Sequence, residues 1–150
     1  MAEYSAIARQ TIQAGQNLIL TDVPVSGMCE GIIHRDGSGI ITLMSPRAAR
    51  GMVRYSVSFS ANVAIPADGT AATPLSLSLA IDGEPLQSST MIVTPPAVNE
   101  FWNVSTFSII ELPAGCCFAI AVENTGTDAT DVQNANLVIE RGRIGWVKRD

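Results

Sequence analysis

Charge is scarce in this sequence. Only 15% of its 150 residues are Asp, Glu, Lys or Arg, whereas a typical soluble domain carries about 25%. The net charge of −5 gives no global basic field that would hold nucleic acid. A weakly charged exterior has two explanations: other copies of the chain cover part of it, or hydroxyl and amide groups alone keep it polar. We expect the first.

Residues that carry enzyme chemistry are also few. The single histidine, His34, lies beside a turn, and a Ser-His-Asp or Cys-His arrangement would depend on it alone. The three cysteines, Cys29, Cys116 and Cys117, are odd in number and lack the spacing of metal ligands. No phosphate-binding or dinucleotide-binding glycine motif is present. The sequence predicts no catalytic residue, no metal site, no cofactor and no enzymatic activity.

Long apolar runs are absent as well. No segment approaches the roughly 18 residues that a membrane-spanning helix needs. The first ten residues, MAEYSAIARQ, lack the basic and apolar regions of a secretory signal. We therefore expect no membrane partner and synthesis in the cytoplasm without a signal peptide. If the protein works outside the cell, it would leave by lysis or within a released particle.

The strongest positive signal is an alternation of apolar and polar residues over residues 53–63. The polar positions are Arg54, Ser56, Ser58, Ser60 and Asn62. A period of two fits a β-strand with one face in the core, and a helix cannot use it. The apolar positions, all on one face, are Val53, Tyr55, Val57, Phe59, Ala61 and Val63.

Shorter alternations predict further strands throughout the chain. Clear examples cover residues 75–82, 118–123 and 134–140, and weaker ones cover 5–13, 17–22, 31–34, 39–43, 90–94 and 103–112. Asp36-Gly37 and Asp82-Gly83 supply tight turns between them. Residues 45–52 are the only place for a short helical turn. One all-β domain follows, and many short strands are compatible with a two-sheet sandwich or a barrel.

The order of these landmarks resembles a known module. The segments that carry it are GIIHRDGSGIITL, RYSVSFSANV, LSLSLAIDGEPL, SSTMIVTP and FWNVSTFSIIELPAGCCFAIAVENTGTDATDVQNANLVIER. They resemble the C-terminal jelly-roll domain of collagen-like spore-surface glycoproteins, related to the tumour necrosis factor and complement C1q type of fold. Similar stalkless chains are small structural proteins of Clostridia-type bacteria and their phages. No Gly-X-Y tract precedes the domain here, which argues against the stalked spore-filament role.

The resemblance implies a two-sheet antiparallel jelly-roll sandwich of about eight to ten strands. It also implies a homotrimer in which sheet faces and aromatic residues meet at a threefold axis. We accordingly assign trimer or core packing to the aromatic residues Tyr55, Phe59, Phe101, Trp102, Phe107 and Phe118. An exposed Phe101–Trp102 pair has a second interpretation, stacking on sugar rings together with the loop at residues 66–73.

The termini extend beyond the expected sandwich. We divide the chain into an N-terminal strand or arm (residues 1–22), the jelly-roll domain (23–141) and a C-terminal tail (142–150). Apolar Ile144, Trp146 and Val147 lie beside basic Arg143 and Lys148. Such a tail predicts docking on a neighbouring subunit or an acidic surface. The alternative is a frayed tail that contains an incidental tryptophan.

Two functions remain open from the sequence. The first is a homotrimeric structural protein that decorates or builds a particle surface, with a phage virion favoured over a spore or cell surface. Its partners would be copies of itself and other virion or surface-lattice proteins. The second is a receptor- or carbohydrate-binding head of a phage fibre or of a bacterial or spore surface, which would bind a host glycan or receptor.

Overall fold

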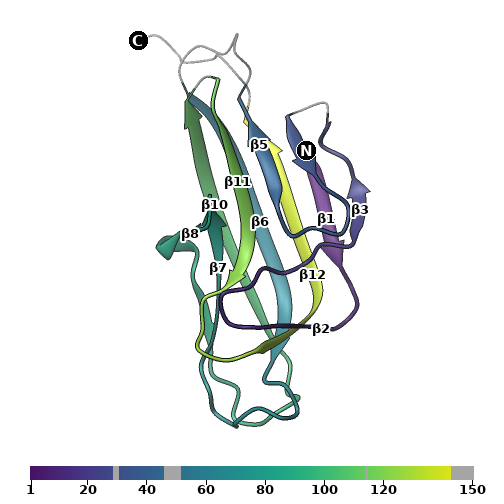
Figure 1. Ribbon diagram of the computed structural model, residues 1–150, viewed down its shortest axis with the longest axis vertical. Coiled ribbons are helices and arrows are strands. Elements are labelled where there is room, and N and C mark those ends of the chain that lie inside the picture. The colour runs from purple at the N-terminus through teal and green to yellow at the C-terminus, as the bar shows by residue number, and fades with distance from the viewer. Residues whose placement is uncertain (29–30, 46–51, 114, 143–150) are drawn as a thin grey trace.

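Two antiparallel sheets packed face to face make up the fold (Figure 1). The computed structural model describes residues 1–28, 31–45, 52–113 and 115–142. The first sheet has the order β10 (Trp102–Pro113), β6 (Met52–Ala64), β12 (Thr130–Arg141), β1 (Ala2–Ala6) and β3 (Asp22–Val25), with β2 (Gln10–Ile12) also on β12. The second has the order β4 (Ile32–His34), β5 (Ile41–Met44), β11 (Cys117–Asn124), β7 (Leu75–Ile81) and β8 (Glu84–Pro85), with β9 (Met91–Val93) also on β7. The predicted all-β, two-sheet antiparallel sandwich is confirmed.

The alternating segment forms the longest strand, β6, which lies between β10 and β12. Its apolar side chains from Val53 to Val63 face the second sheet, and each is at most 2% exposed. Its serines at positions 56, 58 and 60 therefore face away from the core. A single strand thus supplies both the centre of the core and the middle of the outer face of the first sheet.

Two predicted turns have the backbone that their glycines require. Gly37, between β4 and β5, has a φ of 72°. Between β7 and β8, Asp82 and Gly83 have φ angles of 50° and 85°. Two successive left-handed residues twist a two-residue hairpin in the same sense as its strands, and Asp-Gly is a preferred pair for that turn.

The prediction of a strand over residues 17–22 is wrong for most of that range. Asn17 forms an isolated bridge with Glu123, and the amide of Leu18 donates to Val122 O at 2.8 Å. The amide of Leu20 then turns to Ser38 O in the β4–β5 hairpin. Because the backbone partner changes within two residues, no ladder forms, although Leu18 and Leu20 are both buried.

Three other segments bear on predictions made from the sequence. Residues 1–22, separated above as an arm, contribute β1 and β2, and β1 pairs with both β12 and β3. Gln87–Ser89 forms a 3₁₀ turn that the sequence did not indicate. Of the segment expected to hold a helical turn, residues 46–51 lie outside the described residues.

We predict that Gly39→Ala strongly destabilises the fold. A Cβ at this position would lie 2.0 Å from the backbone oxygen of Leu18, and Leu18 is held to β11 through its own amide. The free energy of unfolding, measured by urea titration, should fall by about 3 kcal/mol, which is the upper range for overpacking. Gly37→Ala is the matched control. Its φ of 72° is strained for alanine but its Cβ meets nothing within 4 Å, so about 1 kcal/mol is expected. Equal losses would contradict the clash.

Candidate functional site

The outer face of the first sheet carries an apolar patch at its β10 edge. Phe107 is 63% exposed and Ile109 is 58% exposed. They lie two residues apart on one strand, so both side chains project from the same face. Phe107 is opposite Ser58 of β6, and Ser58 is opposite Val138 of β12. An exposed aromatic ring therefore borders a row of small hydroxyl side chains.

The serine row of Ser56, Ser58 and Ser60 runs along the middle of this face. Ser56 pairs with Ile109 on one side and Ser60 with Asn136 of β12 on the other. A serine side chain is short and uncharged, so another surface can approach the sheet closely above this row. We call Phe107, Ile109, Val138 and the serine row the assembly face.

Polar contacts bound the assembly face at both ends. Toward the start of β6, Arg54 Nε donates to Glu111 Oε1 at 2.7 Å. Toward its end, Asn103 Nδ2 donates to Asn62 Oδ1 at 3.2 Å, and Asn62 Nδ2 donates to Asn134 Oδ1 at 3.4 Å. The exposed ion pair contributes little stability. These three contacts lie at the two ends of the face, so its apolar part is confined to the middle of the sheet.

The aromatic residues assigned to packing occupy three different environments. Tyr55 and Phe59 are buried in the core, and Phe118 is partly buried against it. The hydroxyl of Tyr55 donates to Met44 O, and desolvation by burial raises the pKa of its phenol. Of the six aromatic residues assigned to packing, Phe107 lies on the assembly face. Ile109 was not among the residues predicted from the sequence, although the adjacent pair Ile109–Ile110 in a strand requires one of them to face outward.

Phe101 and Trp102 lie where the sheet meets a cluster of loops. The guanidinium of Arg9 stands over the Phe101 ring, 5.1 Å from its centroid. Arg9 also donates to Asn99 Oδ1 at 2.7 Å and forms an ion pair with buried Asp131. One face of the Phe101 ring is therefore covered within the chain. Trp102 is 44% exposed.

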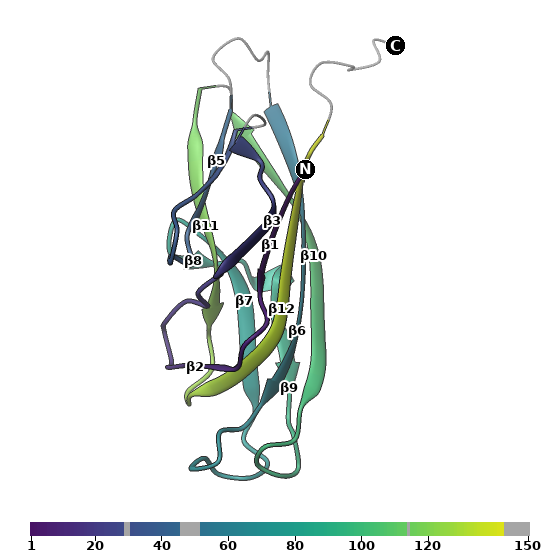
Figure 2. The same cartoon turned by 90° about the vertical axis from the view of Figure 1, so that its right-hand side faces the viewer.

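The loops at residues 65–74 and 94–101 are joined at one end of the sandwich (Figures 1 and 2). The Asn99 amide donates to Ile65 O at 2.9 Å, and the Ala72 amide donates to Pro95 O at 3.0 Å. The structure thus brings the 66–73 loop to the same end as Phe101 and Trp102. These two contacts fasten both loops to each other.

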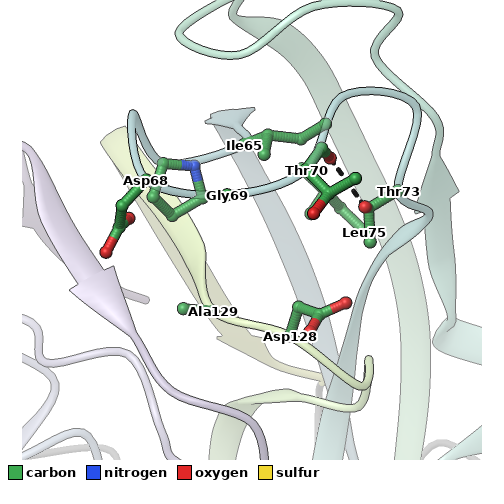
Figure 3. Close-up of a pocket in the computed structure, with 9 residues that line it drawn as sticks. Ile65, Asp68, Gly69, Thr70, Thr73, Leu75, Asp128 and Ala129 are labelled. Carbon is green, nitrogen blue, oxygen red and sulfur yellow. Dashed lines mark hydrogen bonds between the residues drawn. The ribbon is translucent and has the colours of Figure 1, made fainter.

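A pocket of about 230 Å³ opens at this end (Figure 3). It lies between the 65–74 loop and the turn that connects β11 to β12. Phe101 and Trp102 do not line it. Its lining residues are Ile65, Pro66, Asp68, Gly69, Thr70, Thr73, Leu75, Asp128 and Ala129.

The remaining candidate groups form no reactive arrangement within the described part of the chain. His34 Nε2 bonds to Ser38 O at 2.8 Å, and its ring lies against Tyr4. Cys116 and Cys117 are exposed free thiols. Among the described residues, no three His, Cys, Asp or Glu side chains gather where they could bind a metal ion, and no helix has the length and apolarity to cross a membrane.

The predicted docking tail is not tested by the structure. Its residues, Arg143, Ile144, Trp146, Val147 and Lys148, lie outside the described residues.

Comparison with known proteins identifies the fold. No protein-family model and no curated protein sequence matches the chain. Among solved structures, the globular domain of the zebrafish complement 1qA protein matches with a TM-score of 0.53 and 13% identity, covering 91% of this chain and 94% of that one. Murine APRIL matches with a TM-score of 0.48 and 9% identity, covering 88% of this chain and 98% of that one. The C-terminal domain of EclA, a sugar-binding protein, matches with a TM-score of 0.37 and 17% identity, covering 90% of this chain and 79% of that one. The chain has the C1q-type jelly-roll fold that the sequence resemblance implied.

Proposed function

We propose that this protein is a non-enzymatic structural protein that works as a homotrimer on the surface of a particle. The observation that carries the proposal is the assembly face. Phe107 and Ile109 are more than half exposed beside a row of serines, and adjacent exposed apolar side chains of this size mark surfaces that another molecule covers. The low charge of the whole chain, 15%, supports the same conclusion.

The placement of these residues favours a closed ring of copies. Phe107 is on β10, an edge strand of the first sheet, whereas the serine row is on β6 inside the sheet. The projecting Phe107 side chain and the serine row are thus different parts of one surface. If the Phe107 edge of one copy packs on the serine row of the next, the contact is heterologous, and such contacts form a ring when the rotation between successive copies closes. Three copies per ring is the number that the sequence resemblance implies.

The resemblance to small structural proteins of bacteria and their phages supports a phage virion as the particle, with a spore or cell surface as the alternative location. Other virion or surface-lattice proteins would then be its partners. Nucleic acid is not an expected partner, because the net charge is −5.

A receptor- or carbohydrate-binding head is a second candidate. The observation in its favour is the exposure of Trp102 at the end where two loops are joined, because an exposed indole can stack on a sugar ring. A glycan array would test it. Binding that is lost in Trp102→Ala supports this candidate, and an array without signal above background contradicts it.

Light scattering in solution tests the trimer directly. The expected mass is about three times the 15.8 kDa of one chain, because the assembly face should be covered at micromolar concentration. A mass equal to one chain over the whole range from micromolar to millimolar would overturn the proposal.

A further inference from the structure

Two sulfur side chains face each other on the outside of the second sheet. Cys117 of β11 and Met44 of β5 are directly opposite in the antiparallel ladder that joins these neighbouring strands (Figure 1). The next residue of β11, Phe118, packs against the core, and Leu43 of β5 is buried in it. Cys117 and Met44 therefore project from the opposite, outer face. Cys117 is an exposed free thiol and Met44 is 43% exposed, so a dissolved ion has access to both.

The backbone hydrogen bonds around this pair bring the two side chains close together. The Met44 amide donates to Gly31 O at 2.8 Å, on the side of β5 that is away from β11. The next amide, that of Ser45, donates to Cys116 O at 3.0 Å. Cys117 and Met44 are therefore a non-hydrogen-bonded pair, the type in which facing side chains lie closer. The Cβ atoms of directly opposite residues are about 4.5–5.5 Å apart.

This separation suits a single ion held between the two sulfur atoms. A metal–thiolate bond in proteins is about 2.3 Å long, so two such bonds across an ion span about 4.6 Å. The sulfur atom is one bond beyond Cβ in Cys117 and two bonds beyond it in Met44. Both side chains are exposed and have several staggered rotamers available. Each sulfur can therefore turn toward an ion that lies between the strands.

The chemistry of the two donors selects a soft metal ion. Thiolate and thioether sulfur favour copper(I), whereas carboxylate and carbonyl oxygen suit magnesium and calcium. Structural zinc requires four protein ligands, and the described part of the chain has no group of three His, Cys, Asp or Glu side chains that could hold a metal ion. Copper(I) has a filled d shell and accepts as few as two ligands, so the pair is sufficient for it.

We propose that Cys117 and Met44 bind one copper(I) ion. On binding, the Cys117 thiol releases its proton to solvent and its sulfur becomes a thiolate ligand. The uncharged thioether of Met44 donates an electron pair through Sδ. No electron is transferred, and the ion with its thiolate carries no net charge. The site goes beyond the proposed assembly, because both residues are on the second sheet whereas the assembly face is on the first.

Anaerobic titration of the whole chain with copper(I), in competition with a chromogenic chelator, tests the site. We expect one tightly bound ion per chain and an X-ray absorption spectrum with two sulfur neighbours at about 2.3 Å. Cys117→Ser should abolish this binding. Met44→Leu nearly conserves the volume of the side chain but removes the thioether. Replacing a residue that only orients a metal ligand typically costs about 10-fold or more in affinity, so Met44→Leu should weaken binding by at least that factor.

Two matched controls remove sulfur that is not part of the pair. Cys116→Ser replaces the adjacent exposed thiol. Met52→Leu replaces a methionine that is 51% exposed on β6, in the first sheet. Both variants should bind copper(I) as tightly as the unmodified protein.

Four results would overturn the proposal. If Met44→Leu binds copper(I) as tightly as the unmodified protein, or if the spectrum shows a single sulfur neighbour, a thiolate alone holds the ion. If Cys116→Ser or Cys29→Ser abolishes binding, the ion is held by a different thiol. One ion per two chains would show that copper(I) joins two copies instead of two strands of one copy.

Discussion

Replacing Phe107 with Asp should convert the proposed trimer into single chains. The Phe107 ring is 63% exposed in one copy and would be covered when copies meet through the assembly face. A carboxylate buried at its place would lose its hydration without gaining a partner. Truncation of a central aromatic residue typically weakens an interface by about 2 kcal/mol or more, which is at least about 30-fold in affinity per contact. Light scattering should then give the mass of one chain at concentrations where the unmodified protein is trimeric.

A matched control separates loss of assembly from loss of the fold. Ile92 is 67% exposed on β9, a strand of the second sheet. Ile92→Asp therefore introduces the same charge on an exposed apolar position that is not part of the assembly face, and it should remain trimeric. Neither side chain is in the core. The free energy of unfolding of monomeric Phe107→Asp, measured by urea titration, should therefore lie within about 0.5 kcal/mol of that of the unmodified monomer. If Phe107→Asp stays trimeric, or if Ile92→Asp also dissociates, another surface joins the copies.

The sandwich was predictable because its strands carry a local signal. In β6 every second side chain is buried, so the period of two appears directly in the sequence. The Asp-Gly turns at Asp36 and Asp82 are local as well, because the left-handed backbone depends on the residues of the turn itself. Residues 17–22 lack such a signal. Apolar Ile19 stands between Leu18 and Leu20, so no period of two is present. The hydrogen-bond partners that decide against a strand are Val122 and Ser38, which are distant in the sequence.

The candidate surfaces were less predictable because they depend on contacts between distant residues. Phe107 could be selected as an aromatic residue, but its neighbour on the assembly face, Val138, is set by the register of β12 on β6. The two carboxylates of the pocket, Asp68 and Asp128, belong to turns that only the sandwich brings together. Arg9 also contacts Asp131 and Phe101, which are both distant from it in the sequence. Polar residues in turns have no period that would indicate such pairings.

Asn124 shows how a residue of turn-forming type can instead hold the structure together, and its replacement should be severely destabilising. Asparagine is common in turns, yet the Asn124 side chain is fully buried and bonds to Gly126, Asp128 and Ile12. Asn124→Ala would leave the Ile12 carbonyl, whose bond to Asn124 is buried, without its partner, together with the partly buried Gly126 amide and Asp128 carbonyl. Unmade buried hydrogen bonds cost about 1–3 kcal/mol each, so we expect a loss of about 3 kcal/mol in the free energy of unfolding measured by urea titration.

The matched control for this prediction is Asn136→Ala. Asn136 is partly buried and donates one side-chain bond, to Glu3 Oε1 at 2.9 Å. Water can replace that bond, so a loss below about 1 kcal/mol is expected. Asn124→Asp keeps the shape of the side chain but replaces the donor that serves Ile12 O and Asp128 O with a charged acceptor, so it should destabilise at least as much as Asn124→Ala. If Asn124→Ala destabilises no more than Asn136→Ala, then the Asn124 bonds do not fix the β11–β12 turn, and the Asp128 wall of the pocket is held by the remainder of the turn.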